Sequence, residues 1–125
     1  MKKINSEKAP AALGPYSQAI ITGNLVFVSG QLGIDYLTAE FVGDSIEEQT
    51  KQALNNIKSI LQEENLLMTD VVKATVLLSD IKDFTAMNNI YATFFDVPYP
   101  ARAAFEVANL PKYAKVEIEV IAEIK

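Results

Sequence analysis

The sequence predicts an α+β fold in which two helices cover one face of a β-sheet. Two segments, near residues 45–64 and 83–95, show apolar side chains at helical spacing. Around them lie runs rich in β-branched residues, and the last run alternates with the period of two of a half-buried strand. The order is hairpin, helix, strand, helix and strands, and a length of 125 residues indicates a single domain over residues 1–125.

The two helices carry clear signals of their own. Ser45 and Glu48 at the start of the first have the spacing of a capping box. Its apolar stripe consists of Ile46, Ala53, Leu54, Ile57, Ile60 and Leu61. The stripe of the second helix consists of Phe84, Met87, Tyr91, Phe94 and Phe95. We interpret this stripe as core, and we expect Pro98 and Pro100 to end the helix.

The strands follow from β-prone runs. Residues 20–28 contain two such runs around Gly23 and Asn24, which predicts a hairpin. Further strands are expected over residues 71–78, 102–107 and 116–124. Residues 25–28 and 76–78 are apolar on both faces, yet two helices cover only one face of a sheet. We therefore expect a second copy of the chain to cover the other face.

The composition excludes several classes of chemistry. The chain has no histidine and no cysteine, which excludes Ser-His-Asp and Cys-His mechanisms, disulfides and zinc sites built on those residues. The net charge is −5 and the 11 Lys and Arg residues are scattered, so we expect no nucleic-acid partner. No apolar run reaches the roughly 18 residues of a membrane span. The polar N-terminus does not resemble a signal peptide, so we expect a cytoplasmic protein without a membrane partner.

Arg102 and Glu117 are the first candidates for a catalytic pair. If the last two strands pair, these side chains project from neighbouring strands and flank one pocket. A guanidinium binds a carboxylate through two hydrogen bonds, while a carboxylate orients and partly deprotonates a water. A surface ion pair or two solvated side chains fit the same spacing. The spacing alone leaves these interpretations open.

Further residues are candidates for a pocket. A Gly-Pro turn presents Tyr16, either as a packing side chain or as a pocket wall. Gly30 indicates either a bulge in a strand or a close approach of a ligand to the backbone, where Ser29 offers a hydroxyl. Asn88 is most simply a polar residue on a helix surface.

Taken together, segments from most of the chain resemble the RidA/YjgF family. Each segment is weak alone, but their order and spacing are specific. They are residues 9–19 (APAALGPYSQA), 28–31 (VSGQ), 71–76 (VVKATV), 83–84 (DF), 87–88 (MN) with Tyr91, 100–102 (PAR), 106–108 (EVA), 110–111 (LP) and 116–119 (VEIE).

The resemblance implies a chorismate-mutase-like fold with a mixed sheet, a homotrimer, and active sites between subunits. It implies hydrolysis, without a cofactor, of 2-iminobutanoate, 2-iminopropanoate and related enamines such as 2-aminoacrylate to 2-keto acids and ammonia. By position in the motifs, Arg102 corresponds to the arginine that binds the substrate carboxylate and Glu117 to the glutamate that positions water. The other matching pocket positions are Tyr16, Ser29, Gly30 and Asn88.

Two features depart from the family pattern. Ala104 stands where many relatives have Cys, which excludes a thiol there but leaves the backbone N–H of Ala104 to donate to a ligand. Residues 96–100 form a shorter segment than in some relatives, which bears on the rim of the pocket. Two other functions stay open: a regulatory module that binds a small carboxylate, and an endoribonuclease or translation inhibitor, which the acidic charge disfavours.

Overall fold

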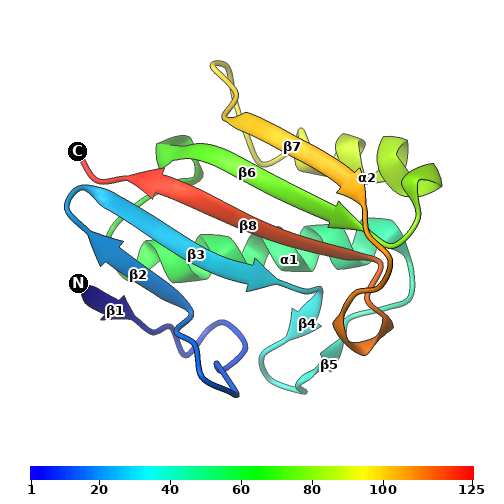
Figure 1. Ribbon diagram of the computed structural model, residues 1–125, viewed down its shortest axis with the longest axis horizontal. Helices are drawn as coiled ribbons and strands as arrows, with labels where there is room; N and C mark the ends of the chain where they lie inside the picture. Colours follow the sequence, from blue (N-terminus) through cyan, green and yellow to red (C-terminus); the bar gives the residue numbers. More distant parts are fainter.

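The computed structural model of residues 1–125 has two layers, a β-sheet and a pair of α-helices (Figure 1). The α+β class predicted from the sequence is confirmed. The main sheet consists of β1 (Lys2–Ile4), β2 (Ala19–Thr22), β3 (Leu25–Gln31), β6 (Val71–Leu78), β7 (Ala101–Glu106) and β8 (Val116–Glu123). The helices are α1 (Ile46–Gln62) and α2 (Phe84–Tyr91). A small ribbon joins β4 (Ile34–Asp35) to β5 (Glu40–Phe41), and the 3₁₀ turns are η1 (Met68–Asp70), η2 (Ile81–Asp83) and η3 (Pro111–Tyr113).

The main sheet is mixed, with the strand order β1-β2-β3-β8-β6-β7. Every neighbouring pair is antiparallel except β6 and β7, which are parallel. Parallel strands need a crossover connection, and α2 supplies it. The predicted hairpin is present as β2 and β3. The last strand of the chain, β8, therefore lies in the middle of the sheet rather than beside β7.

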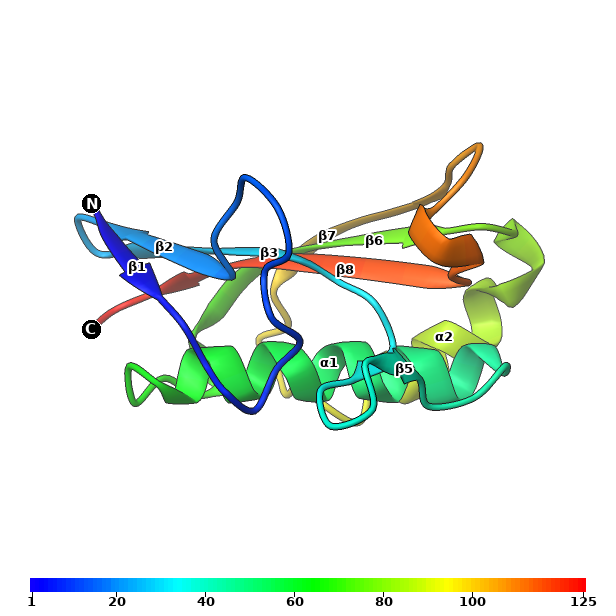
Figure 2. The same cartoon turned by 90° about the horizontal axis from the view of Figure 1, so that it is seen from below.

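Both helices pack on the same face of the sheet, as predicted (Figure 2). The Ser45 hydroxyl accepts a hydrogen bond from the N–H of Glu48 at 3.0 Å and donates one to its carboxylate at 2.9 Å. The bond from the Glu48 N–H satisfies a backbone donor that the first turn of α1 would otherwise leave unpaired. The apolar stripe predicted for α1 is buried against the sheet along its whole length.

The second helix is shorter than the sequence predicts, because α2 ends at Tyr91 although the apolar stripe continues to Phe95. The N–H groups of Thr93 and Phe94 donate to carbonyls three residues earlier, at 3.0 Å each. The Thr93 hydroxyl also donates to the carbonyl of Ile90 at 2.6 Å. Such bonds tighten the last turn and replace the four-residue bonds of an α-helix. Phe95 still reaches the core.

Sequence analysis does not predict β1 or the β4–β5 ribbon, because strands of two or three residues are too short to show a periodic pattern. A buried side chain of α1 ties this ribbon to the helix. The amide of Asn56 donates to the carbonyls of Leu32 and Ile34 at 3.1 and 3.0 Å. These bonds fix the chain just after β3, where a cavity opens.

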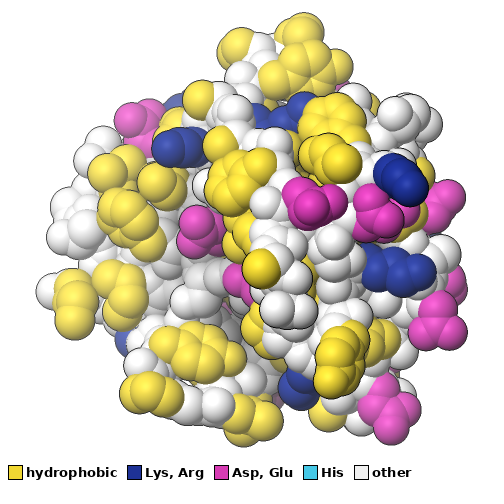
Figure 3. Space-filling model, turned by 45° about the vertical axis from the view of Figure 1, so that its right-hand side comes forward, with side chains coloured by type: hydrophobic (Ala, Val, Ile, Leu, Met, Phe, Trp, Pro, Cys, Tyr) yellow, Lys and Arg dark blue, Asp and Glu magenta, His cyan; other side chains and the backbone are white.

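The other face of the sheet has no cover within the chain. Phe27 of β3 and Phe105 of β7 point away from the helices and are 43% and 48% exposed. Hydrophobic side chains lie over this side of the molecule with acidic ones between them (Figure 3). Leu25 and Phe27 of β3 and Leu77 of β6 thus give this face an apolar part, as the sequence predicts for residues 25–28 and 76–78, whereas β8 presents Glu117 and Glu119 to it. None of the helices is both long and apolar enough to cross a membrane.

Candidate active site

The structure places Arg102 and Glu117 apart within one chain. The last two strands do not pair, because the β6-α2-β7 crossover places β6 between β8 and β7, so the condition under which Arg102 and Glu117 would flank one pocket is not met within the chain. Arg102 lies opposite Ala74 of β6, whereas Glu117 lies opposite Leu77. The two Cα atoms are about 14 Å apart, because they lie two strand spacings apart across the sheet and three residues apart along the strands. Their side chains also leave opposite faces of the sheet, since Arg102 contacts α2 and Glu117 alternates with core residues.

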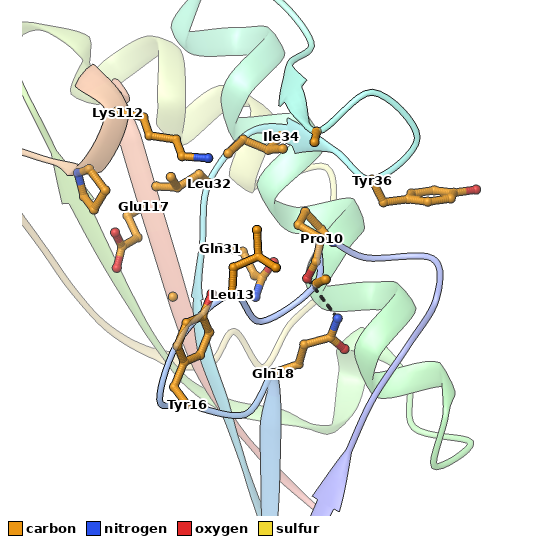
Figure 4. Close-up of a pocket in the computed structure, with 14 residues that line it drawn as sticks. Pro10, Leu13, Tyr16, Gln18, Gln31, Leu32, Ile34, Tyr36, Lys112 and Glu117 are labelled. Carbon is orange, nitrogen blue, oxygen red and sulfur yellow. Dashed lines mark hydrogen bonds between the residues drawn. The ribbon is translucent and has the colours of Figure 1, made fainter.

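Glu117 lines a cavity of about 510 Å³ beside the end of β3. Tyr16 and Gly30, both predicted pocket residues, line the same cavity. Figure 4 shows the Glu117 side chain from β8, Tyr16 and Leu13 from the N-terminal loop, and Lys112 from η3 around this space. Much of the remaining wall is apolar and comes from the N-terminal loop and residues 32–39. The structure therefore brings three of the predicted site residues together.

Gly30 lies directly against the Glu117 carboxylate. The register between β3 and β8 shifts between Val28 and Gln31, so the predicted bulge at Gly30 is present. A methyl group at Gly30 would overlap Oε2 of Glu117 and lie 2.8 Å from its Cδ. The missing side chain leaves the space that the carboxylate occupies.

The pKa of the Glu117 carboxyl is raised above its ordinary value. Burial is the larger cause, and the negative charge of Glu119, two residues along β8 on the same face, is the smaller one. Both effects disfavour the charged form of the carboxyl. A carboxylate with a raised pKa holds a proton more firmly than an ordinary glutamate, which suits it to exchange protons with a bound water.

Ser29 holds the loop that carries Tyr16. Its hydroxyl donates to the carbonyl of Ser17 at 2.6 Å, and its N–H donates to the carbonyl of Gln18 at 2.9 Å. The single proton of the hydroxyl is therefore engaged by the loop. Ser29 lies next to the cavity and fixes one of its walls.

Gln18 and Lys112 also line the cavity and were not among the site residues predicted from the sequence. The buried Gln18 side chain accepts a hydrogen bond from the N–H of Ser6 at 2.7 Å and donates to the carbonyls of Ser6 and Pro10 at 3.1 and 2.9 Å. These bonds fasten the N-terminal loop over the cavity. Lys112 has a left-handed backbone, with φ of 56°. A glutamine after a turn gives no signal that its side chain fastens a loop, and a lysine after a proline gives no signal that it lines a cavity.

Arg102, Asn88 and Ala104 form a second group at the outer edge of the sheet. Nη1 of Arg102 donates to Oδ1 of Asn88 at 2.7 Å. The guanidinium carbon lies 4.7 Å from the ring centre of Tyr91 and 5.5 Å from that of Phe84. Ala104 follows on the same face of β7 and is half-buried. No ion pair of the structure involves Arg102, so its charge is not neutralised within the chain.

The two groups have complementary chemistry. One provides a carboxylate for proton transfer inside a cavity, and the other provides a guanidinium that can bind a carboxylate through two hydrogen bonds. No cluster of three or more acidic side chains is placed to hold a metal ion. Fold and site together define a class: small α+β proteins with a cavity-lining glutamate and an arginine without an acidic partner on opposite faces of one sheet.

Comparison with known proteins identifies the family within this class. A family model described as Endoribonuclease L-PSP matches residues 6–124, and the chain belongs to this family. A 2-iminobutanoate/2-iminopropanoate deaminase from Capra hircus is 51% identical over 119 residues, which are 95% of this chain and 87% of that protein. The resemblance to the RidA/YjgF family is confirmed.

Solved structures agree with this assignment. RidA from the Antarctic bacterium Psychrobacter sp. is 45% identical, with a TM-score of 0.95 over 99% of this chain and 100% of that one. E. coli TdcF, solved with bound serine, is 39% identical, with a TM-score of 0.95 over the full length of both chains.

The contact between Gly30 and Glu117 predicts the effect of one methyl group. We expect Gly30→Ala to displace the carboxylate and to lower a reaction that uses it about 100-fold, since a misplacement of about 1 Å can have that effect. Gly23→Ala is the matched control. Gly23 has a left-handed φ of +57° but nothing within 4 Å of an added methyl, so this change lowers the free energy of unfolding by about 1 kcal/mol and leaves activity intact. Full activity of Gly30→Ala in a steady-state assay contradicts this role.

The raised pKa of Glu117 predicts that its charge destabilises the fold. The folded chain binds this proton more tightly than the unfolded chain, so stability falls as pH rises from the ordinary value of 4.5 through the raised one. Glu117→Gln is therefore expected to raise the midpoint of thermal unfolding at pH 7 and to give no gain below pH 4.5. Glu123→Gln, at the other end of β8, is the control for removing one charge. A lower midpoint for Glu117→Gln at pH 7 would count against the assigned burial.

Proposed function

We propose that this protein hydrolyses 2-iminobutanoate and 2-iminopropanoate to 2-keto acids and ammonia, at sites shared between copies in a homotrimer. The observation that carries the proposal is the presence in one chain of a cavity-lining glutamate and, on another surface, an arginine without an acidic partner. Each is half of a site for a small imino acid. The name of the Capra hircus relative, a deaminase of these two substrates, supports the same reaction.

The separation of the two groups is the reason to invoke a second copy. Arg102 and Glu117 leave opposite faces of one sheet, so one small ligand cannot touch both in the same chain. β7 is an edge strand, which leaves its Arg102 side accessible to a neighbour. The uncovered face with Phe27 and Phe105 gives a neighbour apolar surface to bury. The number three comes from the family resemblance.

In the proposed reaction Arg102 binds the carboxylate of the 2-imino acid. Glu117 of the neighbouring copy holds a water and accepts its proton as the oxygen attacks the imine carbon. The product is a carbinolamine. Proton transfer to its nitrogen turns ammonia into the leaving group, the C–N bond breaks, and the hydroxyl loses its proton to become the keto oxygen. An enamine substrate is first protonated at carbon to give the imine.

The other residues contribute positions rather than protons. Tyr16 forms a wall of the cavity, Gly30 leaves room for the carboxylate, and Asn88 holds Arg102. The N–H of Ala104 on the edge strand is proposed to donate to the substrate carboxylate. Ser29 acts through the loop that carries Tyr16.

The proposal needs only modest rate acceleration and no cofactor. One well-placed general base contributes about 10²–10⁴-fold, and holding substrate and water together adds to this. We place the reaction in the cytoplasm, together with the pyridoxal-phosphate enzymes that release such imines. The net charge of −5 offers no basic track for RNA, so we do not extend the ribonuclease description of the family to this chain.

A coupled assay tests this function. Threonine dehydratase is supplied with threonine, and 2-ketobutyrate formation is followed with and without the protein. We expect acceleration by the wild type. Loss of a charge-assisted carboxylate contact in Arg102→Ala lowers kcat/KM about 10- to 100-fold, and loss of the base in Glu117→Ala lowers kcat about 10²–10⁴-fold. Lys58→Ala, on the outer surface of α1, is the control. Binding of 2-ketobutyrate without any acceleration would favour the regulatory module instead.

A further inference from the structure

We infer that Phe84 and Tyr91 are positioning residues of Arg102, whose rings form an aromatic cradle that fixes the guanidinium for the substrate carboxylate. This inference rests on the proposed role of Arg102 as the carboxylate anchor. It assigns to two apparent core side chains a part in substrate binding.

The cradle follows from helical spacing. Phe84, Asn88 and Tyr91 are spaced by four and three residues, so they share one side of α2. The α2 crossover carries that side past β7, the edge strand that bears Arg102. One stripe of one helix therefore presents two aromatic faces and one amide to a single guanidinium. The same stripe also contributes to the core, which hides this second role in the sequence.

The distances fit attraction between the cation and the rings. The guanidinium carbon lies 4.7 Å from the Tyr91 ring centre and 5.5 Å from the Phe84 ring centre. Both values fall within the range of about 6 Å in which a cation is attracted to an aromatic face. The bond to Asn88 occupies one of the five N–H donors of Arg102. Donors on the remaining edges stay available for a ligand.

The three side chains that hold Arg102, those of Phe84, Asn88 and Tyr91, are all uncharged. A carboxylate from the chain would hold Arg102 equally well but would compete with the substrate for the same N–H groups. Rings and an amide restrain the side chain without cancelling its charge. No ion pair involves Arg102, although the chain has 16 acidic residues. A restrained guanidinium also loses less rotamer entropy when it binds a ligand.

Tyr91 contributes its ring rather than its hydroxyl. The residue is only 5% exposed, so the surrounding core holds the orientation of its ring. The hydroxyl is buried and has no hydrogen-bond partner. Burial raises the pKa of this phenol and the charge of Arg102 lowers it, with burial the larger effect. The phenol is therefore neutral beside Arg102, and phenylalanine should replace it without loss.

Four variants separate the cradle from ordinary packing. Tyr91→Leu and Phe84→Leu each remove one ring over Arg102. Tyr91→Phe is the conservative variant that keeps the ring. Phe95→Leu removes a ring of the same cluster that does not lie over Arg102, and so controls for the loss of aromatic packing alone.

The test measures the dissociation constant for propionate, a carboxylate that cannot react, together with KM and kcat for the imine. We expect each of Tyr91→Leu and Phe84→Leu to weaken propionate binding and raise KM about two- to fivefold, with kcat little changed. Tyr91→Phe is expected to retain wild-type affinity, and Phe95→Leu to lose stability but not affinity. Unchanged affinity in both ring-deletion variants, or an equal loss in Phe95→Leu, overturns the inference.

A readout without catalysis keeps this test separate from the proposed function. The ¹⁵N relaxation of the Arg102 Nε–H reports how firmly the side chain is held. We expect greater mobility on the picosecond-to-nanosecond scale in Tyr91→Leu and Phe84→Leu than in the wild type and in Phe95→Leu. Equal mobility in all of them overturns the cradle even if the enzyme is active. A wild type that holds Arg102 rigidly but hydrolyses no imine overturns the function and leaves the cradle.

Discussion

Two helices on one face of a six-stranded sheet impose the main constraint on this protein. The helix side encloses a continuous core of 24 buried residues, while the other side leaves Phe27 and Phe105 about half exposed. Apolar surface of this kind is stable in water when something covers it. In the proposed assembly a neighbouring copy provides the cover. In the same proposal, the contact also brings Arg102, at the edge of one sheet, to the Glu117 cavity of another copy, so that assembly and catalysis would depend on one interface.

Local stability is given up around Glu117, and the charge of Arg102 is left without an acidic partner. At Glu117, burial and a neighbouring carboxylate disfavour the charged form that acts as the base in the proposed reaction. Arg102 has no carboxylate partner within the chain that would neutralise its charge. Gly30 gives up side-chain packing in a strand to leave space for Glu117. The features at Glu117 and Gly30 are unfavourable for folding, and in the proposed function all three favour the binding of a small acid beside a carboxylate.

The sequence predicted the elements better than their arrangement. The capping pair Ser45 and Glu48, the hairpin and the alternating last strand depend on local spacing, and the structure has them all. Strand order is a long-range property, which is why the position of β6 between β8 and β7 was missed. The end of α2 was missed because bonds around Thr93 override the apolar stripe.

The candidate site residues came from family motifs, and their geometry was not predicted. Family motifs located Arg102 and Glu117, and no spacing rule could show that they leave opposite faces of the sheet. Gln18 was not singled out, because its role depends on which carbonyls lie near it after folding. Phe84 and Tyr91 were correctly placed on one stripe of the second helix. An aromatic stripe does not reveal that Arg102, from a strand later in the chain, lies over its rings.

The central claim is that each site is shared between two copies, and mixing two inactive variants tests it most directly. Arg102→Ala and Glu117→Ala are unfolded together and refolded as a mixture, and mixed oligomers are verified by native mass spectrometry. An interface (here called a seam) between two copies is a complete site when it pairs the intact Arg102 of one variant with the intact Glu117 of the other. With equal amounts, about one seam in four is of this kind, so we predict recovery of about a quarter of the wild-type rate. Mixed oligomers that remain as inactive as either variant alone would contradict the shared site.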